Sequence, residues 1–209
     1  MITKLSSVIL PGLVLFASCT GVSSIHPVAT DEKDKVFKKE LLGKWNYSED
    51  GEILIPFIVD TIKGSGGKTY LLKIIDTTWD LGNKEQQLAD TSYFLASLVN
   101  LKGKYFIDCA PYLDEYRSIG IGNWTLTGLL NNHKILRVHS VTKDSIIFSS
   151  IDSENLQKLI KEKKLFFRHE VMKDQVLIFE RSVLLQQKLQ ELDKFPSVYT
   201  EKIFATRMK

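Results

Sequence analysis

Histidines are the first residues to examine for chemistry, because imidazole binds metal ions and titrates near neutral pH. The chain has four of them, His26, His133, His139 and His169. His133 and His139 lie an even number of residues apart in a predicted strand, so they share a face with Arg137. We expect that face to be exposed to solvent, because apolar Leu136 and Val138 occupy the other. The spacing is too long for one metal ion to bridge easily, so no metal site is predicted.

His169 and Glu170, next to Arg168, suggest acid–base chemistry. Neighbouring residues of a strand point to opposite faces, so His169 and Glu170 cannot act together on one substrate atom. We therefore interpret these residues as part of a charged outer face.

Cys109 is a candidate nucleophile at the end of an apolar predicted strand. Free cysteines in such positions are usually buried, and no helix N-terminus precedes Cys109 to lower its pKa. The chain lacks the Gly-x-Ser-x-Gly sequence of serine hydrolases, and the glycines of residues 64–69 lack the spacing of a phosphate-binding loop. No catalytic residue and no cofactor is predicted, and an enzyme is the least favoured class.

Asp108 lies in the same predicted strand as Phe106, and both point away from Tyr105, Ile107 and Cys109. If Asp108 faces the protein interior, it is a polar anchor beside an aromatic ring in an apolar cavity. If it faces outward, it is a solvated charge. The residues leave both orientations open.

Aromatic side chains on the predicted strands are the main positive indication of a binding site. They are Trp45, Tyr47, Phe57, Tyr70, Tyr93, Phe106, Phe148 and Phe167. The candidate ligand-binding residues are Trp45, Tyr47, Tyr70, Phe106, Asp108 and, from a long loop, Trp124. The same pattern is typical of a solid core without a cavity, and this alternative stays open.

Cys19 is the residue that predicts where the protein is located. Lys4 precedes an apolar run over residues 8–16 that suits a secretory signal, and Ala17 and Ser18 come directly before Cys19. This arrangement resembles the lipobox of bacterial lipoproteins, although Phe16 stands where Leu is usual. The resemblance implies a signal peptide over residues 1–18, lipid attachment at Cys19 and a site in the bacterial cell envelope, at the outer membrane facing the periplasm. The alternative is an ordinary signal peptide with an incidental cysteine.

The overall charge argues against nucleic acid as a partner. The chain has 28 basic and 25 acidic residues, a net charge of +3, and removal of the segment with Lys4 lowers this to +2. Residues 161–164 are three lysines and Glu162, and they are expected on the exposed face of a helix. With Cys19 acylated, Cys109 is the only remaining thiol, so no intramolecular disulfide is predicted.

The elements that position these residues are mainly short strands joined by turns. We expect a tether over residues 19–30, then strands over residues 43–47, 53–62, 69–75, 92–101, 104–110, 133–141, 145–151, 165–172, 175–180 and 202–208. Pro56 predicts an edge position or a bulge in its strand. Short helices are expected between an N-cap at Thr30 or Asp31 and Gly43, after an N-cap at Asp152 or Ser153, and from Ser182 to Pro196.

The long stretch of residues 111–132 is apolar for a loop and is predicted to be a lid. The succession of hairpins without strand–helix–strand units predicts an antiparallel meander. Closure into a barrel would remove its exposed edges.

Gly43-Lys44-Trp45, after a short predicted helix, resembles the start of the first strand in the lipocalin and calycin group. More of the chain is similar to uncharacterised bacterial lipocalin-like lipoproteins, namely residues 94–108, 133–138 and 156–160, with the last leading to His169-Glu170. The resemblance implies a mainly β, lipocalin-like barrel over residues 31–209, and no established activity. The helices late in the chain depart from a plain lipocalin.

The first functional hypothesis is a membrane-anchored barrel that binds a small apolar ligand or a lipid. The alternative is a structural or interaction lipoprotein whose barrel is filled and whose outer surface docks an envelope protein.

Overall fold

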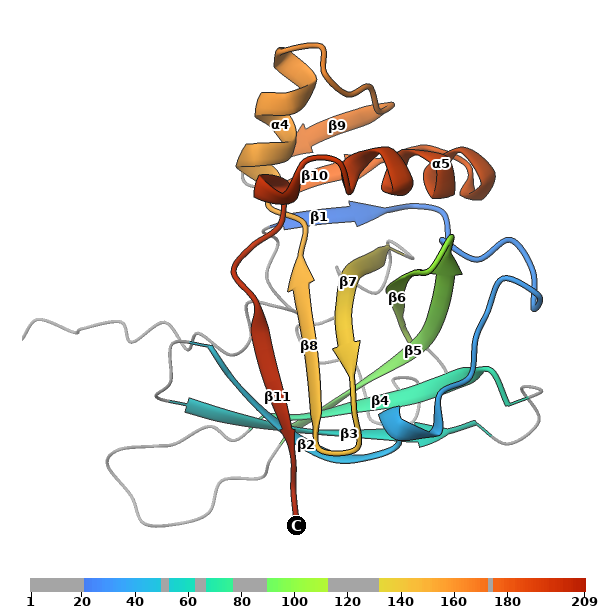
Figure 1. Cartoon of the computed structure of the whole chain (residues 1–209), viewed down its shortest axis with the longest axis vertical. Helices are drawn as coiled ribbons and strands as arrows, with labels where there is room; N and C mark the ends of the chain where they lie inside the picture. The colour runs from blue at the N-terminus through green and yellow to red at the C-terminus, as the bar shows by residue number, and fades with distance from the viewer. Residues whose placement is uncertain (1–20, 50–52, 63–66, 77–89, 113–131, 173–174) are drawn as a thin grey trace, which may run out of the picture.

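A closed antiparallel β-barrel is the main feature of the computed structural model, which describes residues 21–49, 53–62, 67–76, 90–112, 132–172 and 175–209. The barrel strands are β2 (Gly43–Glu49), β3 (Ile53–Thr61), β4 (Thr69–Asp76), β5 (Asp90–Leu101), β6 (Lys104–Pro111), β7 (His133–Val141), β8 (Ser145–Ser150) and β11 (Ile203–Arg207). Each pairs with its predecessor, β11 pairs with both β8 and β2, and every pairing is antiparallel (Figure 1). The predicted mainly β meander that closes into a barrel is confirmed.

Local sequence explains how the barrel strands begin, turn and pair. In the β5–β6 hairpin, Lys102 and Gly103 both have positive φ, and Asn100 accepts a hydrogen bond from the Gly103 N–H (2.7 Å). Pro56 pairs with β2, whereas the pairing of β3 with β4 begins only at Phe57. Since proline has no N–H to donate, Pro56 lies where one side of the strand is free of ladder bonds, as predicted.

Arg207 packs on Trp45 where β11 pairs with β2. The Arg207 guanidinium lies over the Trp45 ring at 4.2 Å and donates to the carbonyls of Leu42 and Glu40, both at 2.7 Å. The indole N–H of Trp45 donates to the Leu41 carbonyl (2.8 Å). Gly43 has a φ of +130°, a backbone conformation that residues with a side chain rarely adopt, and a Cβ there would also meet Arg207 Nη1. Only glycine therefore fits at the start of β2.

The helix expected from Asp31 to Gly43 is wrong, because only η2 (Lys39–Leu41), one short 3₁₀ turn, forms there. The Val36 N–H donates to the Leu98 carbonyl (2.7 Å), and Lys35 forms a β-bridge with Val99. The backbone of this segment thus bonds to the barrel rather than to itself.

A second group of elements, which we call the cap, is inserted between β8 and β11. It contains α4 (Ser153–Lys161), β9 (His169–Met172), β10 (Gln175–Ile178), α5 (Ser182–Leu192) and η3 (Pro196–Val198). Strand β1 (Gly21–Ser24) joins it by pairing in parallel with β10 and antiparallel with β7 (Figure 1). Of the two predicted candidates for the N-cap of α4, Asp152 and Ser153, Asp152 occupies the position and accepts from the Asn155 N–H (2.7 Å).

The tether predicted over residues 19–30 is therefore wrong from Gly21 onward. Val22 is buried in the cap, Ser23 and Ser24 are fully buried, and Val28 is also buried. These small residues lack an apolar alternation. Their backbone is held by strands far away in the sequence, which local patterning does not reveal.

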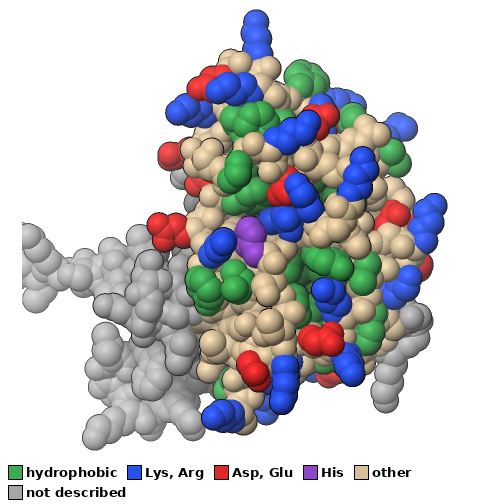
Figure 2. All heavy atoms as spheres, in the orientation of Figure 1, with side chains coloured by type: hydrophobic (Ala, Val, Ile, Leu, Met, Phe, Trp, Pro, Cys, Tyr) green, Lys and Arg blue, Asp and Glu red, His purple; other side chains and the backbone are tan. Residues whose placement is uncertain are grey.

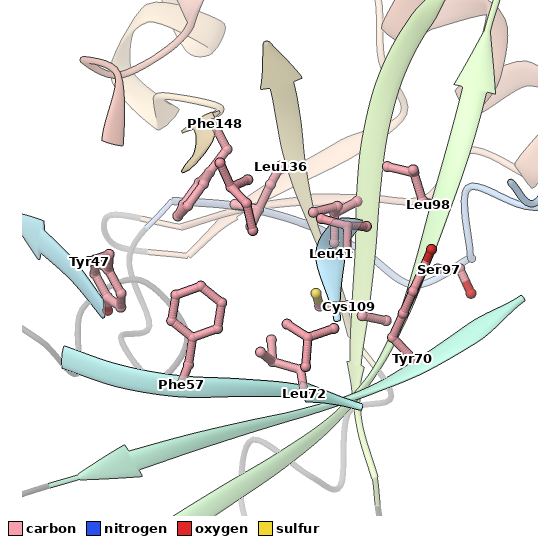
Figure 3. Close-up of a pocket in the computed structure, with 14 residues that line it drawn as sticks. Leu41, Tyr47, Phe57, Tyr70, Leu72, Ser97, Leu98, Cys109, Leu136 and Phe148 are labelled. Carbon is pink, nitrogen blue, oxygen red and sulfur yellow. The ribbon is translucent and has the colours of Figure 1, made fainter. Parts of the chain in front are cut away.

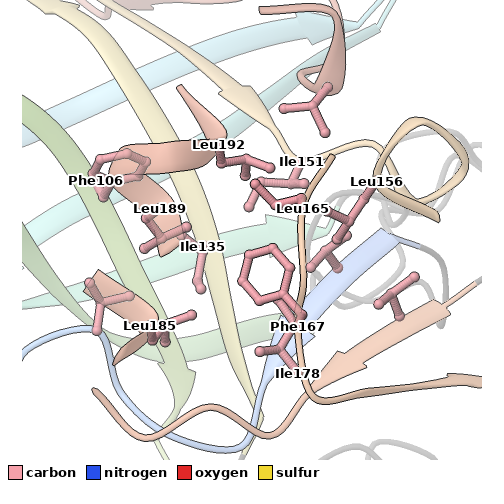
Figure 4. Close-up of a cluster of buried hydrophobic side chains, with 14 of the residues drawn as sticks. Phe106, Ile135, Ile151, Leu156, Leu165, Phe167, Ile178, Leu185, Leu189 and Leu192 are labelled. Atoms are coloured by element: carbon pink, nitrogen blue, oxygen red, sulfur yellow. The ribbon is translucent and has the colours of Figure 1, made fainter. Parts of the chain in front are cut away.

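Two hydrophobic clusters share the β5–β7 wall. One fills the barrel, and the other lies between the outer wall and the cap. Leu185, Leu189 and Leu192, the stripe predicted for α5, are fully buried in the outer cluster, which also holds Phe106 and Ile135 of the barrel wall (Figure 4). No helix in the described part of the chain has the length and apolar character needed to span a membrane.

Candidate ligand cavity

The barrel encloses a cavity with a volume of about 50 Å³. Its lining includes the aromatic rings of Tyr47, Phe57, Tyr70 and Phe148 (Figure 3). Aliphatic side chains complete it, among them Leu41, Leu72, Leu98 and Leu136. The volume exceeds the roughly 10–15 Å³ that one water molecule needs and is below the roughly 300–1,000 Å³ of typical ligand sites.

Strand alternation directs the lining residues inward. Trp45 and Tyr47 alternate on β2, opposite Phe57 and Ile55 of β3. The Tyr47 ring meets Phe57 edge to face at 6.0 Å and Phe148 at 6.5 Å. Such contacts hold the rings in defined positions, so the cavity wall is preorganised.

Four described lining residues carry a hydroxyl or a thiol, namely Tyr47, Tyr70, Ser97 and Cys109. The Tyr70 hydroxyl accepts from the Lys38 N–H (2.7 Å) and donates to the Lys38 carbonyl (3.3 Å), and burial raises the pKa of Tyr70. Burial and the nearby Asp108 charge raise the pKa of the Cys109 thiol, which lines the cavity in its neutral form. None of the described residues that line the cavity is charged. The cavity can therefore offer apolar contact but no acid, base or ion pair.

The structure separates the candidate ligand-binding residues. Tyr47 and Tyr70 line the cavity, whereas Trp45 is buried in the barrel beneath Arg207. Phe106 points out of the barrel into the cluster under the cap, because its neighbours Ile107 and Cys109 face inward. Trp124 and most of the predicted lid lie outside the described residues.

Phe57 and Phe148 line the cavity but were not candidates. Both were among the strand aromatics, and the register of Phe57 with Trp45 explains its inward position. A prediction of strand pairing, rather than of strands alone, could have identified it.

Asp108 faces outward, yet it is not the solvated charge that this orientation predicted. Its side chain is 4% exposed, and its carboxylate accepts from the Val28 N–H (2.7 Å) and contacts His133 Nδ1 (2.7 Å). The expectation that His133 faces solvent is also wrong, since its side chain is 12% exposed. The N-terminal segment around Val28 covers this part of the outer wall, which the sequence pattern of β7 alone does not show.

Arg137 lies under the cap with its side chain 13% exposed, whereas His139 is exposed at the edge of this contact, as predicted, with its ring 6.5 Å from that of Tyr199. Arg137 Nε donates to Asp193 Oδ1 (2.9 Å), which also accepts from the Tyr199 hydroxyl (3.1 Å), and Lys104 forms a further ion pair with Asp193. His139 Nε2 lies 3.0 Å from Ser149 Oγ. We call Arg137, His139, Asp193, Tyr199 and Lys104 the cap network.

The pKa values of the cap network follow from burial and charge. Burial would raise the pKa of Asp193, but hydrogen bonds from Arg137, Lys104 and Tyr199 outweigh it and lower this pKa. Burial, followed by the charges of Arg137 and Lys202, lowers the pKa of His139. Burial and the Asp193 charge raise the pKa of Tyr199. The network thus pairs one carboxylate, Asp193, with two cations, Arg137 and Lys104, which suits a structural link.

The remaining candidates for chemistry are not brought together. His169 Nδ1 lies 2.8 Å from the Phe167 carbonyl, and Glu170 is exposed on β9. Within the described ranges, no group of three or more His, Cys, Asp or Glu side chains could hold a metal ion.

No protein-family model, no curated protein and no solved structure matches this chain. The architecture itself, a closed antiparallel barrel of eight strands, is compatible with a lipocalin-like fold.

Proposed function

We propose that this protein is a lipid-anchored lipoprotein of the bacterial cell envelope, related to the lipocalin-like lipoproteins that it resembles, and that its barrel binds a small apolar ligand or a lipid chain. The observation that carries the proposal is the cavity inside a closed barrel, whose described lining residues are all uncharged. Burial of apolar surface is then the main source of affinity. Cys19 supplies the anchor in this proposal.

The lining specifies the class of ligand. A carboxylate or phosphate would lose its hydration and gain no ion pair among the lining residues, so the part that enters the cavity must be uncharged. The small volume favours the end of one alkyl chain over a ring system with several substituents. Any polar head of the ligand would remain outside the cavity.

Ala96 lines the cavity and allows the proposal to be tested by filling it. Decanol is titrated calorimetrically into the chain beginning at Thr20, as wild type and as Ala96→Leu. The added isopropyl group should weaken decanol binding by about tenfold or more. A change of one or two carbon atoms in a hydrophobic pocket alters affinity by about this factor. Thr206→Leu is the matched control, since Thr206 is exposed on β11. Absence of decanol binding to wild type, or equal binding by all three proteins, would contradict the proposal.

The small volume of the cavity also supports a second candidate, a filled barrel that docks an envelope protein through its outer surface. Crosslinking in intact cells separates the two, because only this candidate requires a discrete protein adduct. In that case wild type and Ala96→Leu should give the same adduct.

Lipid attachment is tested separately. Cells supplied with labelled palmitate should label the wild-type protein and fail to label Cys19→Ser. An unlabelled wild-type protein would remove the anchor from the proposal and leave the barrel part intact.

A further inference from the structure

We propose that Lys161, Lys163, Lys164, Phe166 and Arg168 form a docking surface for the anionic headgroups of a phospholipid bilayer. This basic aromatic surface would hold the barrel in one orientation on the membrane. The inference builds on the proposed anchor at Cys19. It adds a second, non-covalent contact through the cap.

Phe166 is the most exposed of the large apolar side chains in the described ranges, at 68%. Burial alternates along its segment, with Leu165 and Phe167 buried and with Lys164 and Arg168 exposed beside Phe166. The backbone of the segment is fixed, because the Phe179 N–H donates to the Arg168 carbonyl (2.8 Å). The Phe166 ring is thus presented to the surroundings by a fixed backbone.

The charge around Phe166 is strongly positive. Residues 158–168 contain five basic residues and one acidic residue, Glu162, which forms an ion pair with Lys164 (2.8 Å). Exposed Glu154 and Glu170 lie at the borders of this stretch. Figure 2 shows basic side chains around exposed hydrophobic ones over the end of the molecule formed by α4 and β9. An aromatic ring among lysines and arginines is typical of interfacial membrane contacts.

The backbone conformation of Lys163 is a second, independent indication that the positive charge near Phe166 has a function. It has a φ of +56° at the end of α4, where the Lys163 N–H donates to the Ile160 carbonyl and the Lys164 N–H donates to the Leu159 carbonyl, both at 3.0 Å. This pattern is a Schellman motif, and glycine is the favoured residue at the position of Lys163. The chain therefore carries a cation where the backbone conformation favours glycine, as expected where charge has a function.

The distance to the anchor places the cap at the membrane. Thr20 is the only residue between Cys19 and Gly21, so covalent geometry keeps their Cα atoms within about 7 Å of each other. Gly21 pairs with Gln175 of β10, and Gln175 pairs with Met172 of β9. An anchor at Cys19 therefore holds this three-stranded ladder, and the basic aromatic surface next to it, close to the headgroups.

The test uses the full-length, lipidated protein with a single environment-sensitive label. In Phe166→Cys the new thiol accepts a nitrobenzoxadiazole label, whereas Cys109 is buried and its pKa is raised. Val183→Cys and Phe204→Cys are matched controls, because these apolar side chains are 62% and 55% exposed. In vesicles of phosphatidylglycerol and phosphatidylethanolamine, emission should rise several-fold at position 166 and stay unchanged at the controls. A solvent-like signal at position 166, or equal signals at all three positions, would overturn the docking surface.

Failure of the anchor and failure of the surface give different results. Intact mass measures acylation of each sample. If the purified protein carries no lipid, its sedimentation with the same vesicles still tests the surface. Lys164→Gln/Arg168→Gln should then weaken binding by about tenfold, whereas Lys202→Gln, an exposed lysine outside the surface, should not. A response to polyglutamate but not to vesicles would assign the surface to an acidic protein and overturn the proposal.

Discussion

Asp108 shows at the scale of one residue that the outer face of the barrel wall is buried under the N-terminal segment. A carboxylate with a 4% exposed side chain is tolerated because the Val28 N–H and His133 occupy its two oxygens. The bonds join the N-terminal segment, β6 and β7. The residue therefore acts as an anchor for the chain itself and not for a ligand in the barrel.

Asp108→Asn should lower the free energy of unfolding by about 2 kcal/mol, because a neutral amide loses the charge-assisted hydrogen bonds of the carboxylate and offers one acceptor oxygen in place of two. Urea denaturation measures this loss. Asp60→Asn is the matched control, since Asp60 is exposed and its carboxylate accepts only from the neighbouring Thr61 N–H in the described structure. Equal stability of wild type and Asp108→Asn would contradict the role given to Asp108.

Lys163→Gly should raise the free energy of unfolding by up to about 1 kcal/mol, because glycine adopts positive φ without a steric cost. The same change should weaken vesicle binding. Lys161→Gly removes a charge inside α4 instead, and should lower both stability and binding. If Lys163→Gly lowered the free energy of unfolding as much as Lys161→Gly does, the backbone at Lys163 would not be strained.

Strand β1 is an element that the sequence did not predict, because its residues were expected to be part of a tether. If residues 19–30 were a tether, a polar residue at position 22 would have no effect. Because Val22 is buried in the cap, Val22→Asn should lower the free energy of unfolding by about 2–3 kcal/mol. Thermal unfolding followed by circular dichroism measures the shift. Lys33→Asn, at an exposed position, is the control. If the two variants had similar thermal unfolding midpoints, residues 21–30 would behave as the predicted tether.

The cap network links the end of α5 to the barrel, and its pKa shifts predict how stability changes with pH. Folding lowers the pKa of both His139 and Asp193, so the unfolded chain binds protons first as the pH falls. Stability should therefore decrease from about pH 7 to pH 5 as His139 titrates, and further below about pH 4 as Asp193 does. Urea midpoints measured across this range test the sign.

His139→Gln should flatten the part of this profile above about pH 5 and leave the acidic part unchanged. If the wild-type protein instead gained stability as the pH falls from about 7 to about 5, the lowered pKa of His139 would be contradicted.

The elements of the barrel could be predicted from the sequence because each one carries local information. β-Branched and aromatic alternation marks the strands, Lys102-Gly103 marks a tight turn, and Asp152 marks the start of α4. The expected helix over residues 31–43 failed because its backbone bonds to β5, a tertiary effect. The orientation of Phe106 and Asp108 could not be predicted, since residues on both faces of β6 are buried, the inner ones by the barrel and the outer ones by the cap and the N-terminal segment.

At the scale of the whole molecule, one wall of strands separates two hydrophobic clusters. The interior cluster leaves a small apolar cavity, and the outer cluster ties the cap and β1 to the barrel. The two parts have different proposed roles. The barrel would hold an apolar chain, and the cap would face the membrane from which such a chain could come.

Native mass spectrometry before and after organic extraction tests the central claim, a ligand-holding barrel, most directly. Protein purified without detergent should carry an additional mass that disappears on extraction. Ala96→Leu, purified in the same way, should lack it. Identical masses before and after extraction, in both proteins and with the barrel still folded, would contradict ligand binding and favour a filled barrel.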